Sequence, residues 1–281
     1  MITNPAPIAH YENFPVASFL CPAHLRTAVA AIYHFARTAD DLADEGDANA
    51  AQRLADLARY RADLQAIGCG QAHSGQWPQV FGPLQRTLID FQLPLPLLTD
   101  LLDAFEQDIR FTADQRRYAT DAELLDYCSR SANPVGRLLL HLYGVSDAVS
   151  LVQSDQICSA LQLINFWQDV SRDVARGRWY PTQQAMAQFD VNDADLQPDR
   201  STQNATHLIA SCASSARVMM QDGSRLVGRI PGRAGWELRL VVQGGFRVLD
   251  RIEALHFATW RTRPSLKWWD FPVMLWRALW M

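Results

Sequence analysis

The sequence predicts an all-α protein, and three observations lead to this fold class. Apolar residues recur at three- and four-residue spacing along most of the chain, as they do in helices that bury one face. Convincing runs that alternate apolar and polar residues, the pattern of half-buried strands, are absent from the sequence. Glycine and proline interrupt the helical pattern without a shift in composition, so short connections and a single domain over residues 1–281 are expected.

The interruptions divide the chain into consecutive helices. The main breaks fall at GlyCysGly 68–70, ProLeuPro 94–96, AsnPro 133–134 and IleProGly 230–232. Helical spacing of apolar residues covers the segments 24–45, 50–67, 95–111, 121–143, 147–175, 202–229 and 234–260. The segments 24–45 and 147–175 contain strongly apolar runs, so both helices are expected to lie in the centre of the domain.

The composition is that of a globular protein with a substantial core. The chain has 281 residues, and 48% of them are hydrophobic. Its net charge of −4 argues against a general nucleic-acid-binding protein. Nearly all basic residues are arginines, with Lys267 as the single lysine, and planar guanidinium groups suit the oxygens of phosphate groups.

The cysteines and the first residues bear on the cellular compartment. Five cysteines are scattered without a CxxC pair, which indicates reduced thiols and neither a disulfide framework nor a zinc site. They are Cys21, Cys69, Cys128, Cys158 and Cys212. The opening MITNPAPIAHYENFPVAS does not resemble a charged, apolar and cleavable leader, so a cytoplasmic protein is expected.

Two of the expected helices carry oxygen-bearing side chains four residues apart. They are Asp40 and Asp44, with Asp41 beside them, in the first helix and Asn165, Asp169 and Asp173 in the second. A step of four residues turns a helix by about 40° and raises it by about 6 Å, so each set forms a nearly continuous stripe. Like charges at this spacing repel by roughly 0.2–0.5 kcal/mol per exposed pair, so something should compensate.

A solvated acidic face is the simplest explanation of one such stripe. Two features favour a functional site instead. Each stripe adjoins a strongly apolar run, 28–36 or 157–167, and each has arginines nearby. Two facing acidic stripes can share divalent cations, and Mg²⁺ prefers a few carboxylates together with water and phosphate oxygens. The combination predicts a diphosphate site.

These segments resemble the paired aspartate-rich motifs of the squalene and phytoene synthase family, the head-to-head isoprenoid synthases. AspAspLeuAlaAspGlu at 40–45 and AsnPheTrpGlnAspValSerArgAsp at 165–173 carry the resemblance. AsnProValGly at 133–136 lies where the family has a GlyThrValGly loop, and ArgTrpTyrPro at 178–181 resembles its Arg-x-Tyr segment. The resemblance extends from about residue 10 to residue 260 and implies a helical bundle around a central cavity.

The resemblance also implies roles for individual residues. The ligands of the implied cofactor Mg²⁺ would be Asp40, Asp41, Asp44, Asn165, Asp169 and Asp173. Substrate contacts are expected from Arg37, Arg178, Tyr180, Phe14, Gln162 and Asn165. The expected catalytic residues are Tyr33, Tyr127, Asp40, Asp44, Asp169 and Asp173.

Within the family, the segment 10–18 and AsnPro at 133–134 most resemble a bacterial member of the hopanoid pathway. That member is a lyase acting on presqualene diphosphate, a C30 prenyl diphosphate: the diphosphate leaves, the cation rearranges and water captures it. A sister enzyme is the alternative, joining two prenyl diphosphates to presqualene diphosphate, squalene, phytoene or dehydrosqualene. A non-catalytic assembly factor is a second alternative, but such relatives are expected to have eroded aspartates, and both motifs are intact here.

The tail at 265–281 is unusually rich in tryptophan. It is too short and too interrupted to span a bilayer, which needs about 20 apolar residues. Trp268, Trp269, Trp276 and Trp280 could instead lie at the headgroup level of a membrane, which suits a C30 lipid substrate and a peripheral location at the inner membrane face. Packing of the tail over the domain, or between subunits, is an equal alternative. Other enzymes of the pathway are candidate partners.

Overall fold

The computed structural model describes residues 21–281, which form eleven α-helices and two short 3₁₀ helices without a strand. In chain order these are α1 (Arg26–Asp44), α2 (Ala50–Gly68), α3 (Pro78–Phe91), α4 (Leu95–Ala113), α5 (Asp121–Ser131), α6 (Asn133–Leu142), α7 (Ala148–Ala175), α8 (Gln183–Gln188), η1 (Asp193–Leu196), α9 (Gln203–Gly223), η2 (Ser224–Gly228), α10 (Gly232–Ala254) and α11 (Asp270–Leu279). The predicted all-α fold class is confirmed. The expected substrate contact Phe14 and the segment 10–18 lie outside the described residues.

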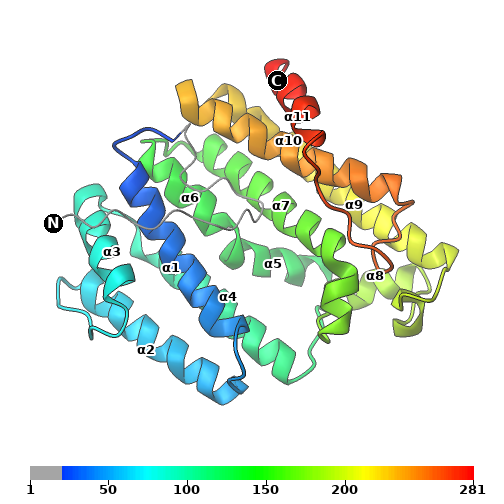
Figure 1. The fold of residues 1–281 in the computed structure, drawn as a ribbon, viewed down its shortest axis with the longest axis horizontal. Helices are drawn as coiled ribbons and strands as arrows, with labels where there is room; N and C mark the ends of the chain where they lie inside the picture. The colour runs from blue at the N-terminus through cyan, green and yellow to red at the C-terminus, as the bar shows by residue number, and fades with distance from the viewer. Residues whose placement is uncertain (1–20) are drawn as a thin grey trace.

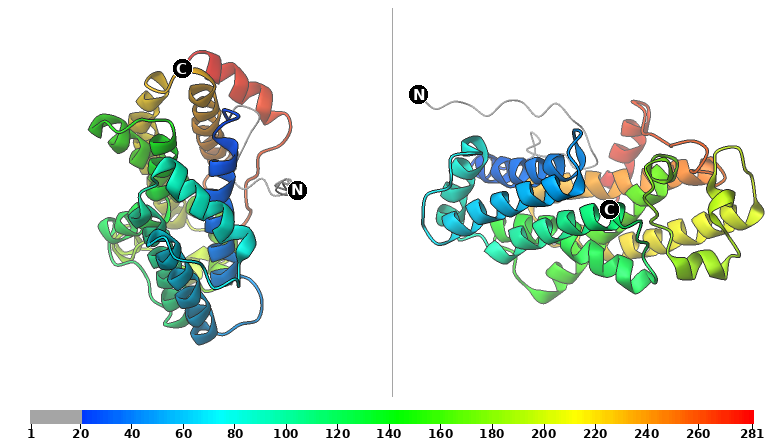
Figure 2. Two further views of the ribbon diagram at one scale, coloured as in Figure 1. Left: turned by 90° about the vertical axis from the view of Figure 1, so that its left-hand side faces the viewer. Right: turned by 90° about the horizontal axis from the view of Figure 1, so that it is seen from below.

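The helices pack as two groups that meet at α6 (Figure 1). Helices α1 to α4 enclose one apolar core, in which Phe35 and Phe81 are fully buried. Helices α5, α7, α9 and α10 enclose the second core. Leu138 of α6 packs into the first core and Leu140 into the second, so α6 joins the two. Figure 2 shows the same arrangement from two further sides, with α1 to α3 and α9 toward opposite ends of the molecule.

The two helices that carry the acidic stripes are central to these groups. In α1, apolar residues at helical spacing, among them Ala28, Ile32, Phe35 and Ala39, are buried. Helix α7 has 28 residues and packs against α6, α9 and α10. It begins at a true cap, because the Asp147 carboxylate accepts the backbone N–H of Ser150 at 3.0 Å. Each helix therefore presents its acidic end from a rigid, well-packed position.

The structure differs from the sequence-based expectation at several helix boundaries. The expected helix 121–143 is two helices, because the backbone bends at Ala132 and Pro134 begins a new helix at its first turn. The expected helix 234–260 ends at Ala254, where His256 and Phe257 adopt positive φ and stop the helical ladder. Helix α3 falls outside the segments that were expected to be helical; Pro78 occupies its first turn and Pro83 lies inside it.

The tail contains a further unexpected helix, α11, which lies on α10 (Figure 1). The tail therefore packs on the domain through α11, as one of the two alternatives expected. None of the helices within residues 21–281 is long and apolar enough to cross a membrane.

Candidate active site

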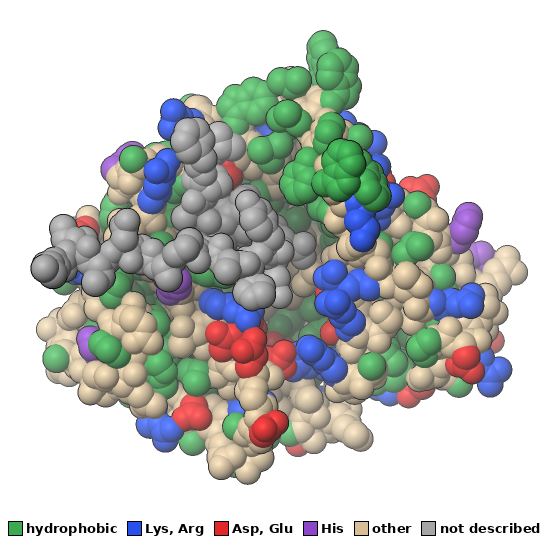
Figure 3. Space-filling view, viewed as in Figure 1, with side chains coloured by type: hydrophobic (Ala, Val, Ile, Leu, Met, Phe, Trp, Pro, Cys, Tyr) green, Lys and Arg blue, Asp and Glu red, His purple; other side chains and the backbone are tan. Residues whose placement is uncertain are grey.

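The acidic ends of α1 and α7 lie at one site. Arg178, in the segment that follows α7, donates to the carboxylate of Asp44 near the end of α1. Arg176 lies 3.5 Å from the other carboxylate oxygen of Asp44. Figure 3 shows acidic side chains gathered near the centre of one face of the molecule, beside a hollow, with cationic side chains around them. Arg176 and Arg178 therefore link the end of the α1 stripe to the segment that leaves α7, and the two stripes do not point toward separate surfaces.

The raised pKa of Asp173 also indicates that the acidic residues of α1 and α7 lie close together. Burial raises the pKa of the Asp173 carboxyl to about 7, and the charges of Asp169 and Asp44 add to this increase. Arg178 and Arg176 oppose it. Because Asp44 belongs to α1 and Asp173 to α7, the effect crosses between the two motifs. The acids of the two motifs therefore interact electrostatically at one site.

Other arginines pair with the remaining acids. Arg37 binds Asp40 at 3.1 Å and Asp41 at 2.8 Å within α1, and its guanidinium also contacts Glu45 at 2.8 Å. In this arrangement Arg37 bridges several acids of one stripe. The first motif is thus held in a compact network around one guanidinium group.

Arg263 is a member of the site that sequence reasoning missed. Its guanidinium donates to both carboxylate oxygens of Asp169, with the longer hydrogen bond at 3.2 Å. The chain is fixed here because Gln168 Nε2 donates to the carbonyl of Pro264 at 2.8 Å. The only signal in the sequence is a short basic segment, 261–263, that has no acidic neighbour of its own.

Asp108 of α4 was also missed. It accepts a 2.7 Å hydrogen bond from the hydroxyl of Tyr127. Burial raises the pKa of Asp108 to about 7; the Tyr127 hydrogen bond and Arg178 oppose this increase, whereas Asp40 and Asp44 add to it. Tyr127 therefore reaches the acidic site through Asp108. A carboxylate on the apolar stripe of α4 was the available signal.

Aromatic side chains form a wall next to these acids. Tyr180 stacks on Phe166 with ring centroids 3.6 Å apart and planes inclined by 10°. Tyr118 lies 5.6 Å from Tyr127 and 6.3 Å from Tyr180 between ring centroids. The predicted residues Tyr127 and Tyr180 are thus brought to one cluster, and their hydroxyl groups adjoin the buried acids.

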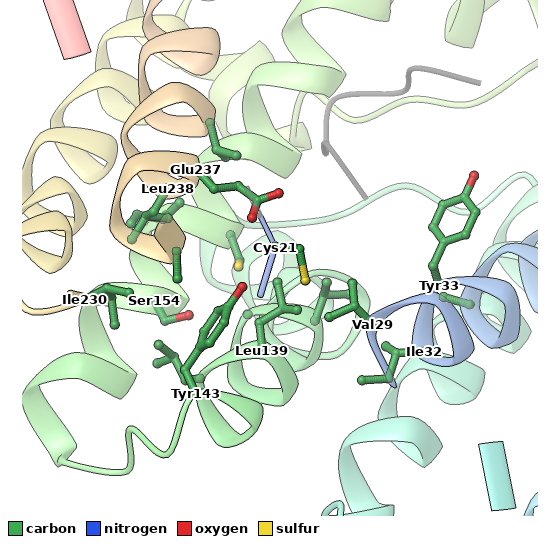
Figure 4. A pocket seen from close by; sticks show the side chains of 18 of the residues that line it. Cys21, Val29, Ile32, Tyr33, Leu139, Tyr143, Ser154, Ile230, Glu237 and Leu238 are labelled. Carbon is green, nitrogen blue, oxygen red and sulfur yellow. The ribbon is translucent and has the colours of Figure 1, made fainter. Parts of the chain in front are cut away.

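An apolar cavity of about 320 Å³ extends from the first motif between α1, α6, α7 and α10. Arg37, Asp40 and Tyr33 line it together with aliphatic side chains such as Ile32 and Leu139. Figure 4 shows Tyr33 on one side of this cavity and Tyr143 on the other. Such a volume and lining suit a largely apolar ligand whose charged end lies at the acidic motif.

Gln162 and Asn165 are half-buried on α7. Asn165 lies one turn before Asp169, as the four-residue spacing predicts, and its side chain is engaged in interactions within the protein. No described contact links Gln162 to the acidic motifs. Its predicted contact with a substrate stays a prediction.

The fit of the site to a divalent cation follows from its donor set. Within residues 21–281, no three acids, histidines or cysteines converge as a ready metal cage. Guanidinium groups occupy carboxylate oxygens of Asp44 and of Asp169 that a cation would use. Hard oxygen ligands from two helices, together with the raised pKa of Asp173, nevertheless fit a cation that binds with substrate phosphate oxygens.

The chain is similar to known proteins over nearly its whole length. Residues 8–270 match the squalene/phytoene synthase family. The chain is 30% identical to a hydroxysqualene synthase of Rhodopseudomonas palustris (strain ATCC BAA-98 / CGA009), over 86% of this chain and 80% of that protein. It is 29% identical to the presqualene diphosphate synthase of the same strain, over 93% and 92% of the two chains.

A solved structure supports the same relationship. The crystal structure of squalene synthase HpnC from Alicyclobacillus acidocaldarius has a TM-score of 0.78 at 35% identity, over 88% of this chain and 90% of that chain. Relatives with different activities match almost equally well, so the comparisons identify the family and not the substrate. Because sequence and fold agree over most of the chain, it belongs to the squalene/phytoene synthase family of isoprenoid-synthesising enzymes.

Proposed function

We propose that the chain is a Mg²⁺-dependent hydroxysqualene synthase, which converts presqualene diphosphate and water to hydroxysqualene and diphosphate. One observation carries the proposal: acids from α1 and α7 lie close enough to affect one another's ionisation, and one of them, Asp40, lines one end of an apolar cavity. The relatives named hydroxysqualene synthase favour this member of the family.

The arginines bind the diphosphate of the substrate. Arg37, Arg178 and Arg263 each carry a planar fork that matches phosphate oxygens, and all three already lie at the acidic site. Binding of an anion lets these groups exchange part of their contact with Asp44 and Asp169 for phosphate oxygens. The charged end of the substrate is thereby fixed at the mouth of the apolar cavity.

The carboxylates of Asp40, Asp44, Asp169 and Asp173 would hold Mg²⁺, with Asp41 and Asn165 as neighbouring oxygen donors. When bound, the ion neutralises negative charge that develops on the leaving diphosphate. The carboxylates must be ionised to serve as ligands. Since the pKa of Asp173 is raised to about 7, proton loss from this group accompanies ion binding near neutral pH.

The reaction itself breaks one bond and forms another. The carbon–oxygen bond to diphosphate breaks, and its electron pair leaves with the diphosphate. The resulting cyclopropylcarbinyl cation rearranges, water forms a new carbon–oxygen bond, and one proton is released. The aliphatic lining of the cavity excludes bulk water until capture, while the aromatic rings of Tyr33, Phe105 and Tyr143 in the same lining stabilise nearby positive charge.

A prenyltransferase is the second candidate function. The presqualene diphosphate synthase relative, at 29% identity over 93% of this chain, favours it. Such an enzyme would join two farnesyl diphosphates at the same acidic site. Both reactions begin with the loss of diphosphate from a prenyl diphosphate. The two candidate functions are therefore distinguished by which diphosphate the enzyme turns over.

The test is turnover of each diphosphate by the purified full chain with Mg²⁺ and without a nicotinamide. Hydroxysqualene and an equal amount of diphosphate are expected from presqualene diphosphate, as measured by gas chromatography with mass spectrometry and by diphosphate release. Coupling of farnesyl diphosphate alone would instead establish the prenyltransferase. The variant Asp169→Ala controls for background hydrolysis, because it removes a proposed ligand.

A further inference from the structure

Helix α11 is firmly mounted on α10 by its inner face. Asp270, at the start of α11, is fully buried and accepts hydrogen bonds from Arg247 Nε at 2.7 Å and from an Arg251 Nη at 2.6 Å. Near the other end, Arg239 donates to the carbonyl of Ala278 at 3.2 Å. The orientation of α11 is therefore fixed by buried charge-assisted hydrogen bonds and is not that of a loose tail.

The outer face of α11 and the residues before it are apolar and exposed. Of the thirteen large hydrophobic residues that are exposed within residues 21–281, seven fall between positions 268 and 280. They are Trp268, Trp269, Phe271, Leu275, Trp276, Leu279 and Trp280, which we call the tail patch. Trp268 and Trp280 are 77% and 76% exposed, so nothing in the described part of the chain covers them. Figure 3 shows apolar side chains gathered at the upper right, close to cationic side chains.

We propose that the tail patch docks this protein on the surface of an anionic lipid bilayer, with α11 lying in the plane of the interface. Tryptophan rings prefer the headgroup level of a bilayer, and a helix with a wide apolar face inserts that face at the acyl boundary. A patch dominated by tryptophan fits this environment better than a dry protein core, since each indole keeps a polar N–H that needs a partner.

Charge identifies the bilayer as anionic. Lys267 directly precedes the tail patch and is exposed. Arg277 lies within the patch and is also exposed, although it pairs with Asp250 at 2.7 Å, whereas the single acid of the tail, Asp270, is buried on the inner side. Beneath the patch, Asp250 and Asp270 accept hydrogen bonds from a larger number of guanidinium groups, contributed by Arg217, Arg247, Arg251 and Arg277. Each cation near an anionic surface adds electrostatic attraction. A second copy docked face to face would place these cations against one another.

Helix α10, to which α11 is attached, also lies between the proposed bilayer surface and the apolar cavity. Helix α10 contacts α11 on one side, and on another it lines the cavity through Ala234, Leu238 and Val241. A lipid in the docked bilayer would therefore lie one helix away from the cavity. This step rests on the proposed function, because a C30 prenyl diphosphate is membrane-soluble; docking itself does not depend on it.

Vesicle flotation of the full chain tests the docking. Binding to vesicles of phosphatidylcholine and phosphatidylglycerol is expected, with at least tenfold weaker binding to phosphatidylcholine alone. The variant Trp276→Ser/Trp280→Ser should lose at least tenfold in binding to the mixed vesicles. The matched control is Ile89→Ser/Val152→Ser, which removes two exposed apolar side chains from α3 and α7 and should bind normally. Lys267→Glu should weaken binding to the anionic vesicles only.

Two outcomes would overturn the proposal. One is equal flotation of the wild-type chain, the tail variant and the control. The other is a dimer in analytical ultracentrifugation that the tail variant converts to monomers, together with no binding to vesicles; the occupant would then be a second copy.

Activity separates docking from chemistry. The tail variant should retain its turnover of presqualene diphosphate dispersed in detergent and lose at least fivefold when the substrate is embedded in anionic vesicles. Asp169→Ala should bind vesicles like the wild type. If the chain turns over no presqualene diphosphate but still floats, the proposed function fails and the docking stands.

Discussion

Arg178 donates to the carboxylate of Asp44, and this contact joins two residues that are 134 positions apart in the chain. Asp44 is the last acid of the stripe on α1, and Arg178 belongs to the segment that follows α7. The contact therefore joins the two helices at the acidic site. The pair is partly exposed, with side-chain exposures of 23% for Arg178 and 35% for Asp44. Its contribution to the free energy of unfolding is therefore small, on the order of 1 kcal/mol, and its importance lies in placement.

Replacing Arg178 separates these two effects. Arg178→Gln should raise the KM for the diphosphate substrate at least tenfold, because a phosphate-binding fork is lost, while the melting temperature changes by only about 2–4 °C. Steady-state kinetics and thermal unfolding measure the two quantities. Arg59→Gln is the control, since it breaks an exposed ion pair with Asp56 on α2, remote from the site. An unchanged KM in Arg178→Gln would contradict the proposed role.

The two aspartates of α7 should differ in stability but not in activity. Asp169→Ala and Asp173→Ala should each reduce diphosphate release at least a hundredfold, since each removes a proposed ligand. Without metal, Asp173→Ala should unfold at an equal or higher temperature, because burial and neighbouring acids disfavour its charge. Asp169→Ala should unfold at a lower temperature, because it leaves Arg263 without its carboxylate partner. Near-normal turnover by either variant would refute the ligand assignment.

The raised pKa of Asp108 predicts a pH-dependent effect on stability. Its folded-state pKa of about 7 lies above the ordinary value of 3.8 for this carboxyl group. Between pH 3.8 and pH 7 the folded protein therefore binds more protons than the unfolded chain, and it loses stability as pH rises through this range. Asp108→Asn removes the titration and keeps an acceptor for the Tyr127 hydroxyl. The melting temperature of the variant relative to wild type should thus rise between pH 4 and pH 7 and stay constant above it. Thermal unfolding in a metal chelator measures this, and a difference independent of pH would contradict the assignment.

Gly136 allows α6 to approach α7 where both line the cavity. A Cβ atom there would overlap Ser154 Oγ and Cys158 Sγ. Gly136→Ala should therefore destabilise the protein by about 1–3 kcal/mol and reduce turnover, because the helices are forced apart. Gly82→Ala on α3 is the matched control: its Cβ would meet no atom within 4 Å, and a gain of roughly 0.5–1 kcal/mol is expected. Chemical denaturation measures both, and equal effects would show that the close packing is unimportant.

The sequence predicted best where one pattern dominates. The spacing of Asp40, Asp44, Asp169 and Asp173, together with apolar periodicity, indicated the helices and their acidic faces before any packing was known. The predicted helix boundaries were less accurate where the local preference of a residue, such as proline, competes with burial in the core. Helix α3 forms despite Pro83 because Val80, Phe81 and Leu84 are buried in the first core.

The sequence by itself determined the fold class, the family and the chemical character of the two acidic helices, because these depend on periodicity and residue type. Only the tertiary structure decided which groups meet at the site. Arg263 reaches Asp169 across 94 positions, and Asp108 joins through Tyr127 of another helix. Tertiary packing also decided that one face of α11 is attached to α10 while the other is exposed. Asp270 accepts a hydrogen bond from Arg247 on the inner face, whereas Trp276 is exposed on the outer face. Such relations arise from packing between distant segments, which local spacing does not encode.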